Sequence, residues 1–335
     1  MGLLCTTCVI DVNTGRRASS DRNPVLVQPA GVGYGQPMPM APGQYGQPQY
    51  GQRGVNEPYA YPPAGVPAGP VLKRSLNIGI NYYRSPQHKL NGCINDAKCM
   101  KYLLQTKFGY QESDMLMLTD EETDPLKRPT RANIINAMRW LVIGVKPGDH
   151  LFFSYSGHGS QVRNVDGQEA DGMDETILPE DFQSAGQIVD NEINRMLVLS
   201  LPPGVRLTAV MDCCHSGTGL DLPYIYTASA GAIHTYCENN VYSLPNGRQG
   251  LGEAVLFSAC SDFQKSADTN ALSGTVSTGA ATYSFIAAIE ASKGYSYASL
   301  LLAMVHTLQT SRSKTQQLPQ ISSSFPLDVN ASFHV

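Results

Sequence analysis

Short apolar runs alternate with amphipathic segments from residue 73 to the end of the chain. The apolar runs predict buried strands at 76–80, 115–118, 151–155, 207–211 and 254–259. Apolar residues that recur every three or four positions predict helices at 95–107, 130–141, 191–201, 280–291 and 297–310. Strands that alternate with helices favour a mostly parallel sheet covered on both faces, so we predict one α/β domain over residues 73–335.

Residues 28–70 differ in composition from the rest of the chain. This segment holds ten of the 22 prolines, and its only charged residues are Arg53 and Glu57. Tyr-Gly-Gln recurs in it three times. Such a segment buries too little apolar surface to offset the entropy lost on ordering. We therefore predict that residues 1–72 form a disordered arm, a flexible tether, with weak self-association as the alternative.

The bulk composition excludes several classes of protein. The net charge is −4 and no basic run exceeds two residues, which argues against a nucleic-acid partner. No apolar stretch approaches the roughly 20 residues of a membrane-spanning helix, and the first ten residues lack the features of a secretory signal. We therefore expect a cytoplasmic protein whose eight cysteines are reduced. Cys5 and Cys8 have zinc-like spacing, but no second pair completes such a site.

Two of the predicted strands end in residues capable of catalysis. Active sites of open α/β sheets lie beyond the carboxyl ends of the strands. Here 151–155 runs into Ser-Gly-His158-Gly159, and 207–211 runs into Asp-Cys-Cys214-His. An imidazole exchanges protons near neutral pH and activates a nearby thiol, and the Gly159 N–H could donate to an oxyanion. Each motif alone is a weak signal, because most turn histidines and free cysteines are not catalytic; the pair is far more specific.

The choice between adjacent cysteines depends on strand geometry. Side chains alternate along a strand, so Asp212 and Cys214 share a face while Cys213 points the other way. We therefore predict Cys214 as the nucleophile, with His158 as its base, and expect Cys213 in the core. His215 is the rival base, but an immediate neighbour of the nucleophile usually faces elsewhere.

These residues resemble the signature of a known family. Tyr-Ser-Gly-His158-Gly, followed 56 residues after the histidine by Cys214 in Asp-Cys-Cys-His-Ser-Gly, is similar to the motifs of the metacaspases. The Pro/Gln/Tyr-rich arm resembles that of the type I subgroup. The resemblance covers about residues 73–335. It implies a caspase-hemoglobinase fold and a cysteine endopeptidase that cleaves proteins or peptides after Arg or Lys.

The resemblance also implies a pocket for the basic P1 side chain of the substrate. Asp96 and Asp212 would line this pocket, and Cys93 and Ser156 would help to shape it. The position of Asp212 agrees, because a carboxylate that closes an apolar strand is costly unless a substrate cation or another group pairs with it. The alternative is that Asp212 only caps a backbone N–H.

Activation by calcium is implied by the resemblance alone. The matching positions are Asp174, Asp190, Asn191 and Asp221. Family members often have Asp at the position of Asn191. Calcium accepts an amide oxygen, but the loss of one negative charge should weaken its affinity.

A pocket for basic residues suggests that the protein can cleave itself. We expect processing at Lys265, in the polar stretch after 254–259, and at Lys73 and Arg74, where the arm meets the domain. Arg53 is a further basic residue within the arm.

The first residues fit a lipidation signal. Met-Gly2-Leu-Leu-Cys5-Thr matches an N-myristoylation pattern with Gly2 as the acceptor, and Cys5 or Cys8 could take the palmitate that stable anchoring needs. We expect peripheral membrane attachment of an otherwise cytoplasmic protein, with an unmodified tail as the alternative.

Two rival functions remain after these steps. The first is a catalytically silent scaffold or quality-control protein that assembles through its arm; loss of either His158 or Cys214 would favour it, yet both are present. The second is a caspase that cuts after Asp, which would need a cationic pocket, whereas Asp96 and Asp212 are acidic. Metacaspases tend to act as monomers, and the resemblance implies the same here.

Overall fold

The computed structural model describes residues 70–164, 172–213, 219–229, 231–237, 251–258, 268–269, 278–291, 294–310 and 317–335. The predicted arm lies outside this part of the chain, apart from residues 70–72. Among the described residues, no helix is long and apolar enough to cross a membrane.

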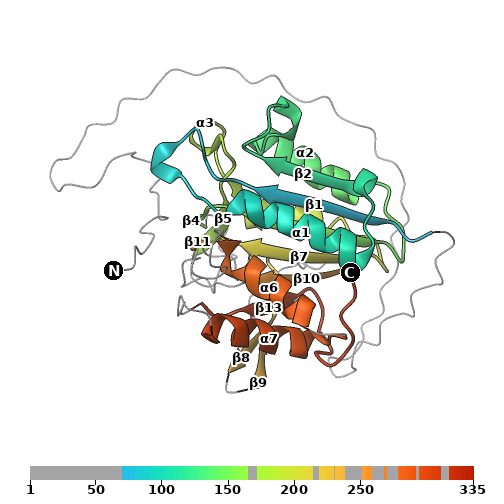
Figure 1. Cartoon of the computed structure of the whole chain (residues 1–335). Helices are drawn as coiled ribbons and strands as arrows, with labels where there is room; N and C mark the ends of the chain where they lie inside the picture. Colours follow the sequence, from blue (N-terminus) through green and yellow to red (C-terminus); the bar gives the residue numbers. More distant parts are fainter. Residues whose placement is uncertain are drawn as a thin grey trace. The chain divides into compact units, whose positions relative to one another are not determined.

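An eight-stranded sheet forms the centre of the domain (Figure 1). Its strands, in their order across the sheet, are β2 (Met115–Thr119), β1 (Lys73–Gly79), β3 (His150–Ser156), β7 (Arg206–Asp212), β10 (Glu253–Ser258), β13 (Gln320–Ser323), β8 (Tyr224–Ser229) and β9 (Ala232–Cys237). The first five are parallel, and the last three continue the sheet in antiparallel pairing. The predicted α/β fold with a mostly parallel sheet is confirmed.

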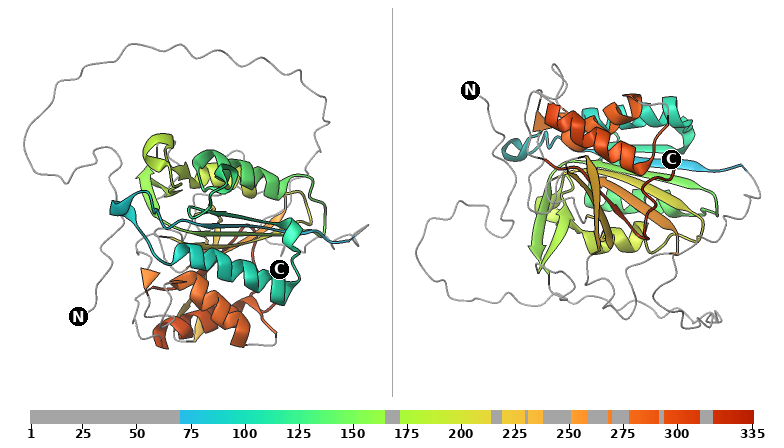
Figure 2. Two further views of the ribbon diagram at one scale, coloured as in Figure 1. Left: turned by 45° about the horizontal axis from the view of Figure 1, so that its top comes forward. Right: turned by 90° about the horizontal axis from the view of Figure 1, so that it is seen from below.

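Helices cover both faces of this sheet. They are α1 (Cys93–Phe108), α2 (Arg131–Val142), α3 (Phe182–Ala185), α4 (Asp190–Leu197), α6 (Ala280–Ala291) and α7 (Tyr297–Thr310). Figure 2 shows α1, α6 and α7 on one face and α2 on the other, where α4 also packs. The domain also has a small sheet of β4 (Gly159–Arg163), β5 (Met173–Ile177) and β6 (Ile188–Val189), and an antiparallel pair of short strands, β11 (Asp268–Thr269) and β12 (Thr278–Gly279).

The two-sided burial follows from the apolar character of the central strands. Phe152 and Phe153 are adjacent in β3 and fully buried, and they join the clusters on opposite faces of the sheet. Burying each such side chain contributes about 1.5–3 kcal/mol. Replacing Phe153 by Ala should therefore cost about 3–5 kcal/mol, since it also leaves a cavity.

Local signals set the ends of the helices near the site. Thr130 caps α2, because its hydroxyl accepts the N–H of Asn133 across 3.3 Å. Gly109 ends α1 with a φ of 73°, a left-handed conformation that glycine adopts without strain. The predicted helix 191–201 instead ends at Leu197 as α4, since a turn follows before Pro202 and Pro203.

Candidate active site

The carboxyl ends of three parallel strands lie level with one another at one edge of the sheet. Gly79 at the end of β1 is paired with Ser156 at the end of β3, and Ser156 is paired with Asp212 at the end of β7. Beyond them, the Gly157 N–H donates to the carbonyl oxygen of Asp212 across 3.4 Å. The histidine motif and the start of the cysteine motif therefore meet at one place, as expected for parallel strands.

His158 is held with a defined proton position. Its ring is 2% exposed, and Nε2 lies 2.7 Å from the carbonyl oxygen of His88. A carbonyl oxygen only accepts, so Nε2 carries the proton and Nδ1 is the acceptor nitrogen of the neutral ring. Burial lowers the pKa of His158 to about 4, although the hydrogen bond to His88 opposes this shift. The ring is therefore neutral at pH 7, which is the form that can accept a proton on Nδ1.

The predicted nucleophile lies just past the described part of β7. Cys214 and the rival base His215 are outside the described residues. Cys213 is 2% exposed and belongs to the apolar cluster on the face of α2 and α4, which confirms that it packs in the core. Asp212 instead contacts α6, on the opposite face, so the alternation predicted for residues 212 and 213 is present.

The two predicted pocket carboxylates lie against the same stretch of backbone. The Gly279 N–H donates to both oxygens of Asp96, across 3.1 and 3.0 Å, and Ser156 donates its hydroxyl to Asp96 across 2.7 Å. Asp212 accepts the N–H of Thr282 across 2.7 Å. A Cβ on Gly279 would lie 2.2 Å from the Asp212 carboxylate, so both acids approach Gly279 closely.

The contacts of Asp212 concern both roles considered for it, pairing with a substrate cation and capping a backbone N–H. Asp212 does accept a backbone N–H in the first turn of α6, which is the capping role that the sequence left open. Asp96 and Asp212 are nevertheless only 2% and 4% exposed and share one location with Ser156. Two buried carboxylates at one place favour a cation between them, so capping and binding are compatible. Cys93 opens α1 one turn before Asp96 and is also buried.

Several contacts of the site come from residues that the sequence did not indicate. The carbonyl of His88 and the N–H groups of Gly279 and Thr282 are backbone groups, which any residue type can supply. Tyr82 contributes a hydroxyl that accepts the His158 N–H across 2.9 Å. Its φ of 56° is a left-handed conformation that costs a non-glycine residue about 1–3 kcal/mol, and no sequence pattern reveals such strain.

The residues matched to a calcium site are crowded and buried. Asp174, Asp190 and Asp221 are all less than a tenth exposed, and Asp190 accepts the N–H of Glu175, another buried acid, across 2.8 Å. The pKa of Asp190 is raised well above its usual range, chiefly by burial and then by the charges of Asp221 and Glu175. Glu175 is a member of this group that the sequence did not indicate.

Asn191 lies within this carboxylate group. Its side-chain amide donates to Asp174 across 3.2 Å, and its N–H donates to Asp190 across 2.6 Å. Carboxylate and amide oxygens are the donors that calcium prefers, so the residues fit that ion in chemistry. Among the described residues, no group of three or more His, Cys, Asp or Glu side chains is arranged to hold a metal ion.

Lys73 and Arg74, two of the residues predicted for processing, are held by the folded domain. Both lie in β1, paired with His150 and Leu151 of β3. The Lys73 ammonium donates to the carbonyl oxygens of Phe108 and Val335 across 2.7 and 2.8 Å. The Arg74 guanidinium donates to the carbonyl oxygens of Trp140, Leu141 and Ile143 at the end of α2, and its Cζ lies 5.0 Å from the centroid of the Trp140 ring. Both residues open β1, so cleavage after either of them would require these first strand residues to leave the sheet, and processing at this junction stays a prediction.

The remaining sequence predictions fall outside the described residues. They concern processing at Lys265, the basic residue Arg53, and the lipidation residues Gly2, Cys5 and Cys8.

Comparisons with known proteins agree with the geometry. The family model described as "Metacaspase, peptidase C14 domain" matches residues 73–223. The chain is 49% identical over 250 residues to Metacaspase-1 of Arabidopsis thaliana, covering 74% of this chain and 68% of that protein. It is 36% identical to Metacaspase-1A of Aspergillus terreus, with 94% of each chain covered.

One solved structure supports the fold. The crystal structure of protein GSU0716 from Geobacter sulfurreducens matches with a TM-score of 0.54 and 24% identity, covering 78% of this chain and 97% of that one. At this identity the similarity concerns the fold alone. The family model and the relatives in plants and fungi show that the chain belongs to the metacaspases, the family of caspase-like cysteine peptidases, as a member of type I.

Proposed function

We propose that this metacaspase is a calcium-stimulated endopeptidase that cleaves after Arg or Lys through a Cys214–His158 dyad. The observation that carries the proposal is the convergence of two buried carboxylates, Asp96 and Asp212, beside Gly279 at the same strand ends that carry the dyad. A buried pair of acids favours a basic side chain and repels an acidic one.

The chemistry of the dyad follows from the tautomer of His158. Nδ1 of the neutral ring takes the proton of the Cys214 thiol, and the thiolate attacks the carbonyl carbon of the P1 residue. The N–H groups of Gly159 and Cys214 donate to the oxyanion. The protonated His158 then gives its proton to the leaving amine, which breaks the peptide bond and leaves a thioester. Water, deprotonated by His158, hydrolyses the thioester and restores the thiol.

The pocket supplies the preference for a basic P1 residue. A guanidinium or ammonium group that enters it exchanges hydration for two carboxylates, and charge-assisted hydrogen bonds of this kind are worth about 1.5–3 kcal/mol each. Asp96 and Asp212 already accept backbone N–H groups, which hold both carboxylates in place for the cation. Such preorganisation reduces the free-energy cost of ordering these side chains when the substrate binds.

We further propose that calcium binds at Asp174, Asp190, Asn191 and Asp221. When bound there, the ion supplies positive charge that offsets the repulsion among the buried carboxylates. Asp174 and Asp190 lie between His158 and Cys214 in the chain, and Asp221 comes seven residues after Cys214. An ion held by them would connect both segments that form the dyad.

Two further proposals concern self-cleavage and lipidation. Self-cleavage is proposed at Lys265 and at the junction of Lys73 and Arg74, where it would require the start of β1 to leave the sheet. Mass spectrometry of the purified protein after calcium addition tests it, and an intact chain with peptidase turnover would show that cleavage is not required.

Myristoylation of Gly2 is proposed for membrane attachment, and Gly2→Ala should shift the protein from the membrane fraction to the soluble fraction.

The central experiment compares matched peptides that differ only at P1. Peptides ending in Arg, Lys or Asp are assayed with calcium or a chelator, using wild type, Cys214→Ala and Cys99→Ala, a control at a half-buried cysteine on α1. Calcium-stimulated cleavage after Arg or Lys that vanishes only in Cys214→Ala is the expected result. Cleavage after Asp would refute the acidic pocket, and no cleavage at all would favour a silent scaffold.

A further inference from the structure

Tyr82 has an unusual backbone conformation next to the catalytic histidine. Among the described residues, Tyr82 and Asp221 are the non-glycine residues with a positive φ, and Tyr82 has a φ of 56°. A bulky aromatic residue is strained in this region and stays there only where its surroundings hold it. Such strain is concentrated at functional sites, so its cause and its consequence both require an explanation.

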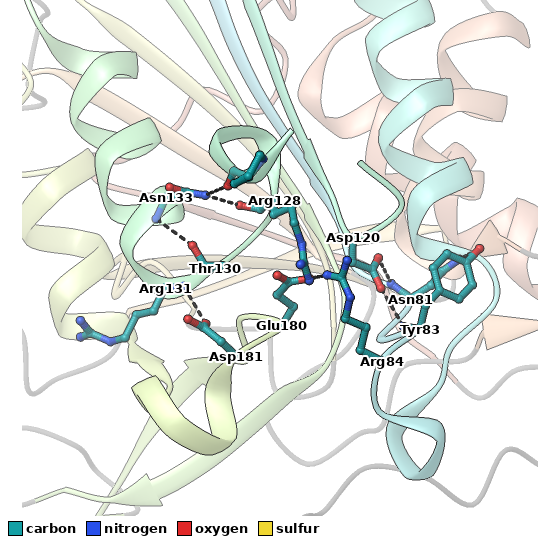
Figure 3. A network of polar contacts seen from close by, with 11 residues as sticks. Asn81, Tyr83, Arg84, Asp120, Arg128, Thr130, Arg131, Asn133, Glu180 and Asp181 are labelled. Atoms are coloured by element: carbon teal, nitrogen blue, oxygen red, sulfur yellow. Dashed lines mark hydrogen bonds and ion pairs between the residues drawn. The ribbon is translucent and has the colours of Figure 1, made fainter. Parts of the chain in front are cut away.

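The cause is the carboxylate of Asp120, which directly follows β2. Oδ1 of Asp120 accepts the N–H of Asn81 and Oδ2 accepts the N–H of Tyr83, each across 2.8 Å (Figure 3). These are the two residues on either side of Tyr82. Asp120 is 5% exposed, so both charge-assisted bonds lie in a protein environment that strengthens them. One carboxylate thus holds the N–H groups of the two residues that flank the strained residue.

The first consequence concerns the backbone of His158. The buried hydroxyl of Tyr82 donates to the carbonyl of Leu178 across 2.6 Å and accepts the His158 N–H across 2.9 Å. The hydroxyl of Tyr155 donates to the carbonyl of His158 across 2.7 Å. Two tyrosine hydroxyls therefore hold the two polar backbone groups of the catalytic histidine. Gly157 leaves room for them, because a Cβ there would lie 2.6 Å from the Tyr155 oxygen.

The second consequence concerns the histidine ring. The Tyr82 and His158 rings are 4.6 Å apart between centroids. The loop that starts at the strained residue contains His88, whose carbonyl accepts the proton of His158 Nε2. This loop is closed by two hydrogen bonds, from Ser85 N–H to the Tyr82 carbonyl and from Leu90 N–H to the Asn81 carbonyl, both 2.9 Å.

We propose that Asp120 and Tyr82 form a positioning pair that sets both the location and the tautomer of His158. The inference rests on the proposed function only in treating His158 as the base of the dyad. A tyrosine that served the core alone would need neither a left-handed backbone nor a hydroxyl bonded to the catalytic residue. Asp120 lies 38 residues before His158 in the chain and reaches it through Tyr82 and the loop to His88.

The role of the hydroxyl is tested with Tyr82→Phe, which keeps the ring. The buried His158 N–H loses its acceptor, and small displacements of a catalytic group are costly, so we expect kcat on an Arg peptide to fall about 10–100-fold while KM changes less than about twofold. Tyr110→Phe is the matched control, since Tyr110 is equally buried and its hydroxyl has no hydrogen bond with the described residues. Equal kcat in wild type and Tyr82→Phe would overturn this role.

The role of the carboxylate is tested with Asp120→Asn, whose amide nitrogen cannot accept the second N–H. We expect ¹⁵N NMR of the histidine side chains at pH 7 to show the Nε2–H tautomer of His158 in wild type and a mixture of both tautomers in the variant, with His158→Gln used to assign the signal. Asp124→Asn is the control, because exposed Asp124 also accepts a loop N–H, from Leu126. A single unchanged tautomer in Asp120→Asn would overturn this role.

The tautomer measurement separates the inference from the proposed function. It needs no substrate and no turnover. A wild type that cleaves no peptide would refute the proposed peptidase activity, whereas the NMR result would still decide whether Asp120 sets the proton position of His158.

Discussion

Gly279 donates its N–H to both carboxylate oxygens of Asp96, although the two residues are 183 positions apart in the chain. The same glycine lies so close to Asp212 that there is no space for a side chain. The chain entering α6 therefore lies against both carboxylates of the proposed P1 pocket, and their close approach depends on a residue without a Cβ.

Replacing Gly279 by Ala should disrupt this pocket. The new Cβ would lie 2.2 Å from the Asp212 carboxylate, so the carboxylate or the backbone must move. We expect kcat/KM on Arg and Lys peptides to fall at least about tenfold and the free energy of unfolding to drop by about 1–3 kcal/mol. Gly294→Ala is the control, since a Cβ there meets nothing within 4 Å. Wild-type activity in Gly279→Ala would mean that substrate binds elsewhere.

Asp212→Asn separates the two roles of Asp212. The amide oxygen can still accept the Thr282 N–H, so the start of α6 should remain folded, but the pocket loses one negative charge. We expect kcat/KM for Arg peptides to fall about 10–100-fold, equivalent to about 1.5–3 kcal/mol for a charged hydrogen bond, with little change in thermal midpoint. Asp328→Asn is the control, because exposed Asp328 also accepts a backbone N–H. A large loss of stability with unchanged relative rates would leave capping as its only role.

The sequence revealed the parallel core because each of its strands is an apolar run. The strands β1, β2, β3, β7 and β10 were all predicted. Because β3 and β7 run in the same direction, the segment with His158 and the strand end with Asp212 lie at the same edge of the sheet. The antiparallel part of the sheet was missed for a physical reason. β13 consists of Gln-Ile-Ser-Ser, so it lacks the apolar run that marks a buried strand. Its polar residues are buried because neighbouring strands cover them.

The site was predictable only as far as it depends on side-chain chemistry. His158 and Asp212 could be named because their residue types and their places at strand ends suit acid–base work or cation binding, whereas Asp96 and Ser156 were named from the family resemblance. The carbonyl of His88 and the N–H of Gly279 act as backbone groups, so their residue types carry no signal. Nor does the sequence reveal that tertiary hydrogen bonds hold the side chains of Lys73 and Arg74, the residues predicted for processing at the end of the polar arm.

His158 should make stability depend on pH in a defined window. Its folded pKa of about 4 lies below the ordinary value of 6.5, mainly because of burial, so the unfolded state binds more protons between these values. Its contribution is fully present above about pH 6.5 and is lost as the pH falls towards 4. We expect wild type to lose roughly 2 kcal/mol more than His158→Gln between pH 7 and 4.5. Urea unfolding at both pH values measures this difference, and equal losses would place the folded pKa near 6.5.

Asn191→Asp should strengthen calcium binding and weaken the calcium-free protein. The Asn191 amide donates to Asp174, so a carboxylate there replaces a hydrogen bond with repulsion among acids that are already buried. Calcium gains a fourth carboxylate among the proposed ligands, and we expect its affinity to rise about 3–10-fold. Calorimetric titration and thermal unfolding with and without calcium check both effects.

The control for that variant is Asn136→Asp on the exposed face of α2, which adds the same charge beside Arg139. A calcium affinity that rises equally in both variants would reflect net charge alone. An affinity that rises only in Asn191→Asp, together with a lower thermal midpoint without calcium, requires that Asn191 itself faces the ion. The opposite signs of the two effects are the discriminating feature, because a merely disruptive substitution at Asn191 would lower both the stability and the affinity.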